Sequence, residues 1–570
     1  MARHTTEFLR QRSSNMSLRM AATSSPMATT TRLCSFANPA EFEKKPTMTE
    51  AEKSIIIGEL KSRRDVKLCD SCYRDLPDSC ADSLSLELTS NRSECSTCAI
   101  AETKPESFTE PFCTFLKENP TIFHTVDYLK AKMTSLGYKE LPPREDWAGK
   151  IEAGGKYFSI RNGSSTIAFT VGKSYKPGNG VAIIAGHIDA LTAKVKPVSK
   201  KATTAGYVQL GVAQYAGALN ETWWDRDLSI GGRVIVRDGS GKTTSKLVKL
   251  DWPIARIPTL APHFGVGMMG QNNKETQAVP IIGLEDPTSS ADDSKPAETL
   301  GPVGSFVSTQ PPKLVKLISN ELGIKDYSQI VNWELELFDL QPATVGGMDK
   351  EFIFAGRIDD KLCSWAAFHG LLASDMKDDD GTIKLVALFD DEEIGSLLRQ
   401  GAKGNFLPSV IERTVESLCG QEKPFGPGVI GQTYANSFLV SADVTHAINP
   451  NFMSRYLQDH APRLNVGICI CADSNGHMTT DSVSTAILTR VCELSGCTPQ
   501  VFQIRNDSRS GGTVGPSISS ALGVRAADAG MPQLSMHSIR ATCGSLDPGL
   551  GVKFFKGFLD KFEQVDAEWQ

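Results

Sequence analysis

Acidic residues and histidines gather where the sequence predicts β-strands to end. Because ligands bind at the carboxyl ends of strands in an open α/β sheet, segments at such ends can converge on one cleft. Imidazole and carboxylate groups, without thiolate, suit a divalent metal ion. The segments with His, Asp or Glu at these places are Gly186–Asp189, Gly356–Asp360, Phe389–Ser396, Ser441–His446 and Ser535–Ser538.

The acidic run of residues 390–393 is the most telling of these segments. It lies between the apolar stretch Leu385–Phe389 and Ile394. A solvated acidic turn is the alternative, but it does not explain why four acids adjoin a buried strand. A cation, or carboxyl groups with a raised pKa, would relieve their repulsion. One glutamate can bind metal while its neighbour acts as general base on a water molecule.

The pair His187-x-Asp189 has the spacing of a metal-binding imidazole that a carboxylate holds through the other ring nitrogen. Alternatively, the two residues form a polar pair at the surface. Asp359 follows a predicted strand, where it could bridge two cations or cap the next helix. Asp443 and His537 complete the set. Each residue alone is a weak signal, whereas their joint placement predicts a two-metal hydrolase.

Longer motifs around these residues resemble the vacuolar aminopeptidase I branch of the aspartyl-aminopeptidase family of zinc metallopeptidases. The resemblance covers about residues 108–565, and its motifs occur in the family's order. The motifs are Gly186–Val198, Arg256–Gly265, Asp390–Ser396, Ser441–His446, Asn506–Pro516, Gln533–Ala541 and Gly549–Gly557.

The resemblance implies a zinc-dependent aminopeptidase with two Zn²⁺ per subunit, a general base at Glu392, and Asp189 orienting a histidine ligand. His446 matches a histidine of the substrate site. His263 matches one that projects into a neighbouring subunit's active site, since the family forms tetrahedral dodecamers built from dimers; alternatively it packs beside Phe264. The implied zinc ligands, with Asp359 bridging both ions, are His187, Asp359, Glu393, Asp443 and His537.

One departure from the family pattern bears on substrate choice. Relatives that prefer N-terminal Asp or Glu carry a lysine near the position of Cys471, and a thiol cannot pair with an acidic side chain as an ammonium does. We therefore expect release of neutral, Leu-like N-terminal residues from peptides, with an aspartyl or glutamyl aminopeptidase as the alternative. Asp391 replaces an asparagine that is common before the two glutamates, which adds negative charge near the metals.

The elements that must position these residues alternate between helix and strand. Helical sequence runs from Phe108 to Gly137, and the β-branched runs Ser164–Val171 and Gly180–Ala185 are typical of strands buried in an α/β sheet. Between 196 and 344, short strands and many turns indicate an inserted β-rich module. After Gly347 the α/β pattern returns, with strands expected at 352–355, 383–389, 438–442, 466–472, 499–504 and 524–528.

The predicted fold is therefore of the α/β class, with a central mixed sheet flanked by helices. We expect the catalytic domain of a metallopeptidase in two parts, residues 108–195 and 345–570. The insertion between them, residues 196–344, is expected to be a β-rich dimerisation domain. The metallopeptidase and dimerisation assignments both follow from the resemblance.

The first 107 residues lie outside most of the resemblance. Residues 1–47 are rich in Arg and Ser and poor in acids, as in a targeting sequence or a disordered extension. Residues 48–107 occupy the place of the family's propeptide, and their start suits a short amphipathic helix. By resemblance, that helix would engage a selective-autophagy receptor for delivery from the cytoplasm to the vacuole. The alternatives are a cytoplasmic enzyme and a self-assembling autophagy cargo with incidental catalysis.

Two cysteine pairs fall within that N-terminal stretch. Cys69-x2-Cys72 and Cys95-x2-Cys98 could close a tetrahedral zinc site, or they belong to an exposed reduced loop. The start of the chain lacks the apolar core of a secretory signal. Most cysteines are therefore expected to be reduced thiols.

Composition argues against two classes of partner. With 60 Lys and Arg against 66 Asp and Glu, the formal net charge of −6 offers no broad attraction for nucleic acid. No apolar run approaches the roughly 18 residues needed to span a bilayer. We therefore expect neither nucleic-acid binding nor membrane insertion.

Overall fold

The structure is a computed structural model of the whole chain, and it describes residues 66–68, 86–88, 104–264, 272–285 and 300–569. The chain divides into two compact units, residues 1–90 and 91–570. In the first unit, strands β1 (Val66–Leu68) and β2 (Leu86–Leu88) pair in parallel. The predicted helix at the start of the propeptide-like segment and the four paired cysteines lie outside the described residues.

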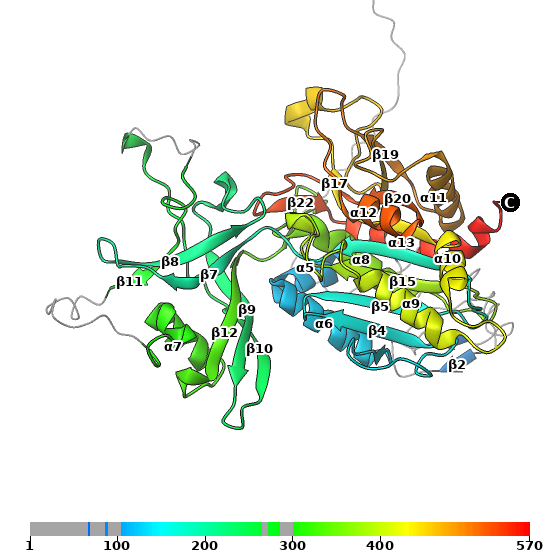
Figure 1. Cartoon of the computed structure of the whole chain (residues 1–570). Helices are drawn as coiled ribbons and strands as arrows, with labels where there is room; N and C mark the ends of the chain where they lie inside the picture. The colour runs from blue at the N-terminus through cyan, green and yellow to red at the C-terminus, as the bar shows by residue number, and fades with distance from the viewer. Residues whose placement is uncertain (1–65, 69–85, 89–103, 265–271, 286–299, 570) are drawn as a thin grey trace, which may run out of the picture. The chain divides into compact units, whose positions relative to one another are not determined.

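The second unit contains a nine-stranded mixed sheet (Figure 1). Its order is β19-β18-β20-β16-β6-β15-β5-β4-β3, and the four central strands from β20 to β15 run parallel to one another. The strands are β3 (Lys139–Glu140), β4 (Lys156–Arg161), β5 (Ser165–Val171), β6 (Val181–His187), β15 (Ile383–Phe389), β16 (Phe438–Ser441), β18 (Cys469–Ala472), β19 (Gln500–Gln503) and β20 (Arg525–Gly530). The prediction of a central mixed sheet is confirmed.

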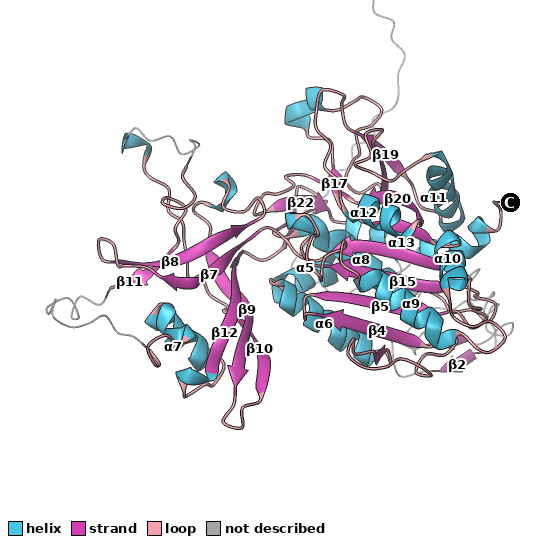
Figure 2. Cartoon of the chain, viewed as in Figure 1, coloured by secondary structure: helices cyan, strands magenta, loops and turns pink. Residues whose placement is uncertain are grey.

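Helices cover both faces of this sheet (Figure 2). Alternate residues of β6 face two separate cores: Ala182 and Ile184 pack into one, whereas Val181, Ile183 and Ala185 pack into the other. Burial on both faces explains why this strand reads as a continuous apolar run. The first core includes α5 (Thr109–Glu118), α6 (Ile122–Ser135), α8 (Ile358–Ala373), α11 (Ser482–Ser495) and α13 (Asp547–Asp566), and the second includes α9 (Phe406–Leu418), α10 (Pro427–Ala435) and α12 (Val514–Leu522).

A second sheet, of six antiparallel strands, lies between β6 and β15 in sequence. Its order is β10-β9-β12-β7-β8-β11. It has a core of its own, which includes Trp223 and Trp333. The elements are β7 (Thr192–Lys200), β8 (Tyr207–Tyr215), β9 (Leu228–Arg237), β10 (Thr243–Lys249), β11 (Ile281–Leu284), α7 (Pro312–Glu321) and β12 (Ile330–Asp339). A dimerisation role for this module stays a prediction.

Two small sheets complete the second unit. The predicted strand at 352–355 forms as β14 (Phe352–Ala355), but it joins β13 (Thr344–Gly346) and β22 (Ala541–Gly544) in a separate three-stranded sheet. Strands β17 (Thr445–His446) and β21 (Pro532–Gln533) pair in parallel. No helix in the described ranges is long and apolar enough to cross a membrane.

The parallel centre of the large sheet brings several predicted site segments to one edge. Strand β6 ends at His187, β15 at Phe389, β16 at Ser441 and β20 at Gly530. Since neighbouring parallel strands end on the same side, the polar residues that follow them share that side. The strand-end pattern read from the sequence thus becomes a spatial cluster.

Gly530 allows β20 to lie close to one member of this cluster. A Cβ at this position would fall 1.5 Å from the carbonyl oxygen of Asp443. We predict that Gly530→Ala pushes the Asp443 loop away, destabilises the protein by about 1–3 kcal/mol as overpacking does, and lowers its metal content. Thermal unfolding and metal analysis measure both effects.

The matched control is Gly428→Ala inside α10, where an added Cβ meets nothing within 4 Å. This variant should gain up to about 1 kcal/mol from helix propensity and keep its metal. Equal melting temperatures for the two variants would contradict the prediction.

Candidate active site

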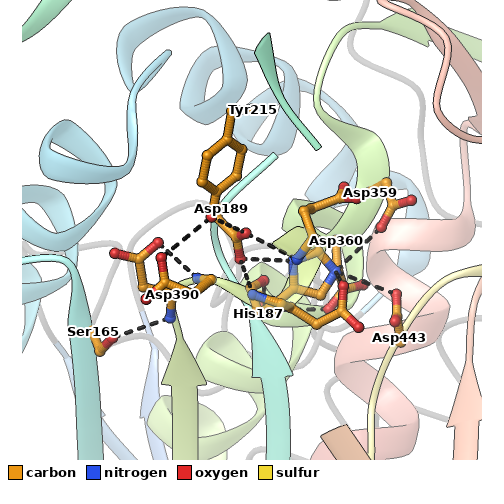
Figure 3. A network of polar contacts seen from close by, with 12 residues as sticks. Ser165, His187, Asp189, Tyr215, Asp359, Asp360, Asp390 and Asp443 are labelled. Carbon is orange, nitrogen blue, oxygen red and sulfur yellow. Dashed lines mark hydrogen bonds and ion pairs between the residues drawn. The ribbon is translucent and has the colours of Figure 1, made fainter. Parts of the chain in front are cut away.

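Imidazole and carboxylate groups from separate segments meet in one cluster beyond the sheet edge (Figure 3). Two sets of ligand atoms each lie within 4.8 Å of one another: one from His187, Glu392 and Asp443, the other from His187, Asp359 and Glu393. Glu392 and Glu393 begin a short 3₁₀ helix, Glu392–Ile394, directly after the strand-end acids. Asp359 lies in the first turn of α8, Asp443 follows β16, and His537 lies between β21 and β22.

Asp359 stands between two histidines. Its Oδ1 lies 3.3 Å from Nε2 of His187, and its Oδ2 lies 3.6 Å from Nε2 of His537. Glu393 Oε2 is 3.7 Å from the same nitrogen of His537. One carboxylate therefore faces two groups of donors with its two oxygens, which is the arrangement of a bridging ligand.

The other half of the cluster approaches the same ring nitrogen of His187. Oδ1 of Asp443 is 3.6 Å from Nε2 of His187, and Oε2 of Glu392 is 3.8 Å from it. His187 is buried, with 1% of its side chain exposed, whereas Glu392 and Asp443 are 16% and 19% exposed. The two carboxylates are therefore the members of this half that a substrate can reach.

Asp189 is a buried organiser of the cluster rather than half of a surface pair. Its Oδ1 lies 3.2 Å from Nδ1 of His187, so the opposite ring nitrogen points at the other carboxylates. The two carboxylate oxygens also accept hydrogen bonds from the backbone N–H groups of Glu392 and Glu393, at 3.2 and 3.1 Å. The hydroxyl of Tyr215, from β8, donates to Oδ2 at 2.8 Å. Figure 3 shows the contacts of His187 and Tyr215 with Asp189.

Crowded acids perturb one another's protonation. Burial, followed by the charge of Asp443 and other nearby carboxylates, raises the pKa of Glu392 to about 8 even though His187 opposes the shift. Burial and the charge of Asp359 raise the pKa of Glu393 to about 10. Burial disfavours the charged form of His187. The attraction of Asp443 and the hydrogen bond between His187 and Asp189 nevertheless raise the pKa of His187 well above the usual value. A divalent cation would reverse the carboxylate shifts by stabilising the ionised forms.

The donor set fits zinc. Nε2 of His187 and Oε1 of Glu393 are buried and have no hydrogen-bond partner among the described residues. Unpaired buried polar atoms are costly unless something binds them, and a metal ion satisfies both the nitrogen and the carboxylate oxygen. Imidazole nitrogen and carboxylate oxygen are regular zinc ligands.

Three non-glycine residues around the cluster adopt left-handed backbone conformations. They are Arg357, Asp391 and His537, with φ of 62°, 64° and 63°. Such conformations cost energy and persist where surrounding contacts hold them. They turn the chain sharply beside Asp359, beside Glu392 and Glu393, and at His537.

A cavity of ≈ 270 Å³ opens beside the cluster. Glu392, Asp443 and His446 line one part of it. The His446 ring lies 5.7 Å from that of Phe502. Its apolar lining includes Cys471, Met478, Phe502 and Ile504.

His263 does not join the cluster within this chain. It lies in a short 3₁₀ helix, Pro262–Phe264, and is exposed. It lines neither the cavity of ≈ 270 Å³ nor a smaller one of ≈ 50 Å³ that also contacts Asp359. Its predicted role in a neighbouring subunit's site stays a prediction.

The sequence did not single out two residues that hold the cluster together. Asp360 is fully buried, and its Oδ1 accepts a hydrogen bond from the Val444 N–H at 3.2 Å, which fixes the loop that carries Asp443. Of this acidic pair, the sequence predicts a role only for Asp359. Tyr215 lies 26 residues beyond Asp189 in the inserted module, and no motif signals their contact.

The family of this chain is shown by its similarity to known proteins. Residues 115–559 match the model of the M18 family, described as aminopeptidase I zinc metalloproteases. The chain belongs to this family. This M18 protein is therefore a zinc metalloaminopeptidase, a hydrolase that removes residues from the ends of peptides.

Curated relatives of this M18 enzyme carry two kinds of name. Vacuolar aminopeptidase 1 of Saccharomyces cerevisiae is 43% identical over 476 residues, which cover 82% of this chain and 91% of the relative. Aspartyl aminopeptidase 4 of the same organism is 39% identical over 479 residues, covering 82% and 97%. Both names state aminopeptidase activity, and only the second names a substrate residue.

Solved structures match the M18 fold over most of the chain. That of Chaetomium thermophilum mApe1 is 65% identical, with a TM-score of 0.76 and coverage of 82% of this chain and 100% of that chain. The S. cerevisiae mApe1 dodecamer is 38% identical, with a TM-score of 0.71 and coverage of 81% and 99%. Ape4 in a complex with Nbr1 is 38% identical, with a TM-score of 0.76 and coverage of 81% and 87%.

Removing zinc from this M18 enzyme should expose the repulsion within the cluster. We predict that a chelator abolishes turnover and lowers the melting temperature, and that added Zn²⁺ restores both. A ligand at 100 times its Kd stabilises the folded state by about 2.7 kcal/mol, which a thermal shift detects readily. Mg²⁺ is the control and should restore much less, because it disfavours imidazole. A melting temperature that ignores the chelator would contradict the prediction.

Proposed function

We propose that this M18 aminopeptidase is a two-zinc enzyme that releases neutral, Leu-like residues from the N-termini of peptides. The observation that carries the proposal is the position of Asp359, whose two oxygens face two different histidines. The proposed ligands are His187, Asp359 and Asp443 for one ion, and Asp359, Glu393 and His537 for the other.

Zinc, when bound, supplies a Lewis acid that acidifies water and polarises the scissile carbonyl. Glu392 lines the cavity of ≈ 270 Å³ beside the cluster, and this position suits a general base. In the proposed reaction it takes the proton of the attacking water and returns it to the leaving amine. Asp189 keeps His187 in one orientation through Nδ1. Ionised carboxylates at the cavity floor would bind the free α-amine of the substrate, which restricts cleavage to the N-terminal residue.

The cavity lining supports the proposed preference for neutral residues. Cys471 is buried in a small apolar cluster with Phe502, against which Met478 and Ile504 pack. An acidic substrate side chain would meet no cation among these four residues. Burying an unpaired carboxylate beside them is costly, whereas a Leu side chain gains by leaving water.

We further propose that the enzyme works as a tetrahedral dodecamer in which residues 196–344 form the dimerisation domain. Support comes from the dodecameric mApe1 structure and from the separate six-stranded sheet. His263 is exposed in this module, as a residue offered to a neighbouring subunit's substrate site must be. His446 would contact the substrate within the same chain, because it lines the cavity.

Location is proposed from the relatives. One is named vacuolar aminopeptidase 1, and Ape4 forms a complex with Nbr1. We propose delivery from the cytoplasm to the vacuole through a selective-autophagy receptor that binds residues 48–107. The cytoplasm is the alternative site of action.

Glu392→Gln tests the mechanism. The amide keeps the size of the side chain but cannot accept the proton, so kcat should fall about 10²–10⁴-fold. Zinc content should stay at two ions per subunit, because Glu392 is not among the proposed ligands. Glu422→Gln, at an exposed position, is the control and should leave both values unchanged. Undiminished turnover in a zinc-loaded Glu392→Gln protein would rule out the proposed base.

Cys471→Lys tests the specificity. We expect wild-type kcat/KM to be higher for Leu-anilide than for Asp- or Glu-anilide. The lysine should shift the ratio toward acidic substrates, because its ammonium can pair with their carboxylates. Cys471→Ser is the control for a small neutral side chain and should keep the preference for Leu. A wild-type preference for Asp or Glu would favour the aspartyl aminopeptidase alternative.

A further inference from the structure

One segment of the inserted module, Tyr215–Thr222, contacts both halves of the metal cluster. It begins at the last residue of β8 and ends in the 3₁₀ helix Glu221–Trp223. At one end it binds Asp189, and at the other it binds the loop that carries His537. Hereafter this segment is called the bridging segment.

The first contact acts on His187 through Asp189. Tyr215 is buried, with 7% of the residue exposed, and its hydroxyl donates to Asp189 Oδ2 at 2.8 Å. The other oxygen of that carboxylate faces Nδ1 of His187. Oδ1 of Asp391 lies farther from the hydroxyl, at 3.4 Å. Because a hydroxyl carries one hydrogen, the shorter contact takes it.

A cation holds the tyrosine ring in place. Nζ of Lys194, on the neighbouring strand β7, lies 4.0 Å from the centroid of the Tyr215 ring. Such a contact stabilises one ring position, because the ammonium is attracted to the π face. Tyr215 therefore presents its hydroxyl to Asp189 from a fixed direction.

The second contact acts on the backbone of His537. Nδ2 of Asn220 donates to the carbonyl oxygen of His537 at 2.9 Å. The N–H of Ile539 donates to Oγ1 of Thr222 at 2.9 Å, and that hydroxyl donates to Oδ1 of Asn220 at 2.6 Å. Three linked hydrogen bonds thus fix the backbone from His537 to Ile539.

Both partners in this contact have unusual backbone conformations. Ala216 and Leu219 in the bridging segment have φ of 56° and 57°, and Ser535 and His537 have φ of 62° and 63°. Non-glycine residues keep such conformations only where neighbouring contacts enforce them. The bridging segment and the His537 loop therefore constrain each other.

We propose that Tyr215 and Asn220 are positioning residues. Through them the inserted module fixes the positions of the two zinc-binding histidines, His187 and His537, relative to each other. The inference rests on the proposed function, since it assumes that His187 and His537 bind zinc. Tyr215 acts on the His187 half and Asn220 on the His537 half. Zinc affinity then depends on how the inserted module sits against the catalytic sheet, and not only on the ligands themselves.

The test uses the full chain with Tyr215→Phe, Asn220→Ala and a control, Tyr207→Phe, from the exposed end of the same strand β8. Zinc per subunit is measured after dialysis against graded chelator concentrations. Loss of an outer hydrogen-bond partner typically weakens metal binding about 10–100-fold. We expect that loss for Tyr215→Phe, and for Asn220→Ala the loss of one ion before the other. Tyr207→Phe should match the wild type.

Steady-state kinetics at saturating Zn²⁺ separate positioning from substrate binding. We expect Tyr215→Phe to recover most of its kcat at saturating Zn²⁺, with KM unchanged. A raised KM in the fully loaded variant would overturn the positioning role. If Tyr215→Phe does not fold, Asn220→Ala decides, because its side chain is only partly buried and its melting temperature can be compared directly with that of the control.

His187→Ala distinguishes a failure of the positioning inference from a failure of the proposed metal site. If it loses zinc while Tyr215→Phe and Asn220→Ala retain zinc like Tyr207→Phe, the positioning inference is wrong and the metal site stands. If His187→Ala keeps both ions under the same dialysis, the proposed metal site is wrong, and the inference falls with it.

Discussion

The crowding of carboxylates around His187 is the constraint on which the rest of the structure depends. Asp189, Asp359 and Asp443 all approach the one buried imidazole, and the strand-end acids adjoin them. Burial and the neighbouring charges of Asp189 and Asp391 raise the pKa of Asp390 to about 8. A protein cannot hold so much negative charge in a low-dielectric site without compensation. Backbone N–H groups, a tyrosine hydroxyl and a divalent cation are the compensation that this fold can provide.

The large sheet makes this crowding possible. Its central strands are parallel and covered on both faces, so their apolar residues fill two cores while their ends project polar side chains to one side. The backbones also approach closely: Gly530 lies directly against the carbonyl of Asp443, which leaves no room for a side chain. A rigid apolar scaffold can carry a strained polar cluster at its edge because the scaffold supplies the stability that the cluster lacks.

The inserted module contacts the candidate metal cluster in this structure. The hydroxyl of Tyr215 on strand β8 donates a hydrogen bond to Asp189. The turn that follows makes hydrogen bonds to the His537 loop. The candidate metal ligands and the proposed base all lie outside the module, yet the module makes hydrogen bonds to Asp189 and to the His537 loop. This arrangement gives a physical route by which movement of the module can alter the metal centre.

The sequence by itself determined the α/β class, the positions of the main strands and the identity of the clustered acids and histidines. Continuous apolar runs such as Val181–Ala185 mark strands buried on both faces, and the strand-end rule then selects the residues that follow. Only the tertiary structure decided that β14 lies in a separate sheet and that Asp359 faces two histidines. It also decided that Asp360, Tyr215 and Asn220 make hydrogen bonds to the segments that carry the cluster. These features depend on turn geometry and on contacts between residues far apart in the chain. Local periodicity and residue spacing do not predict such contacts, because the energies of the contacts arise only when the distant segments meet.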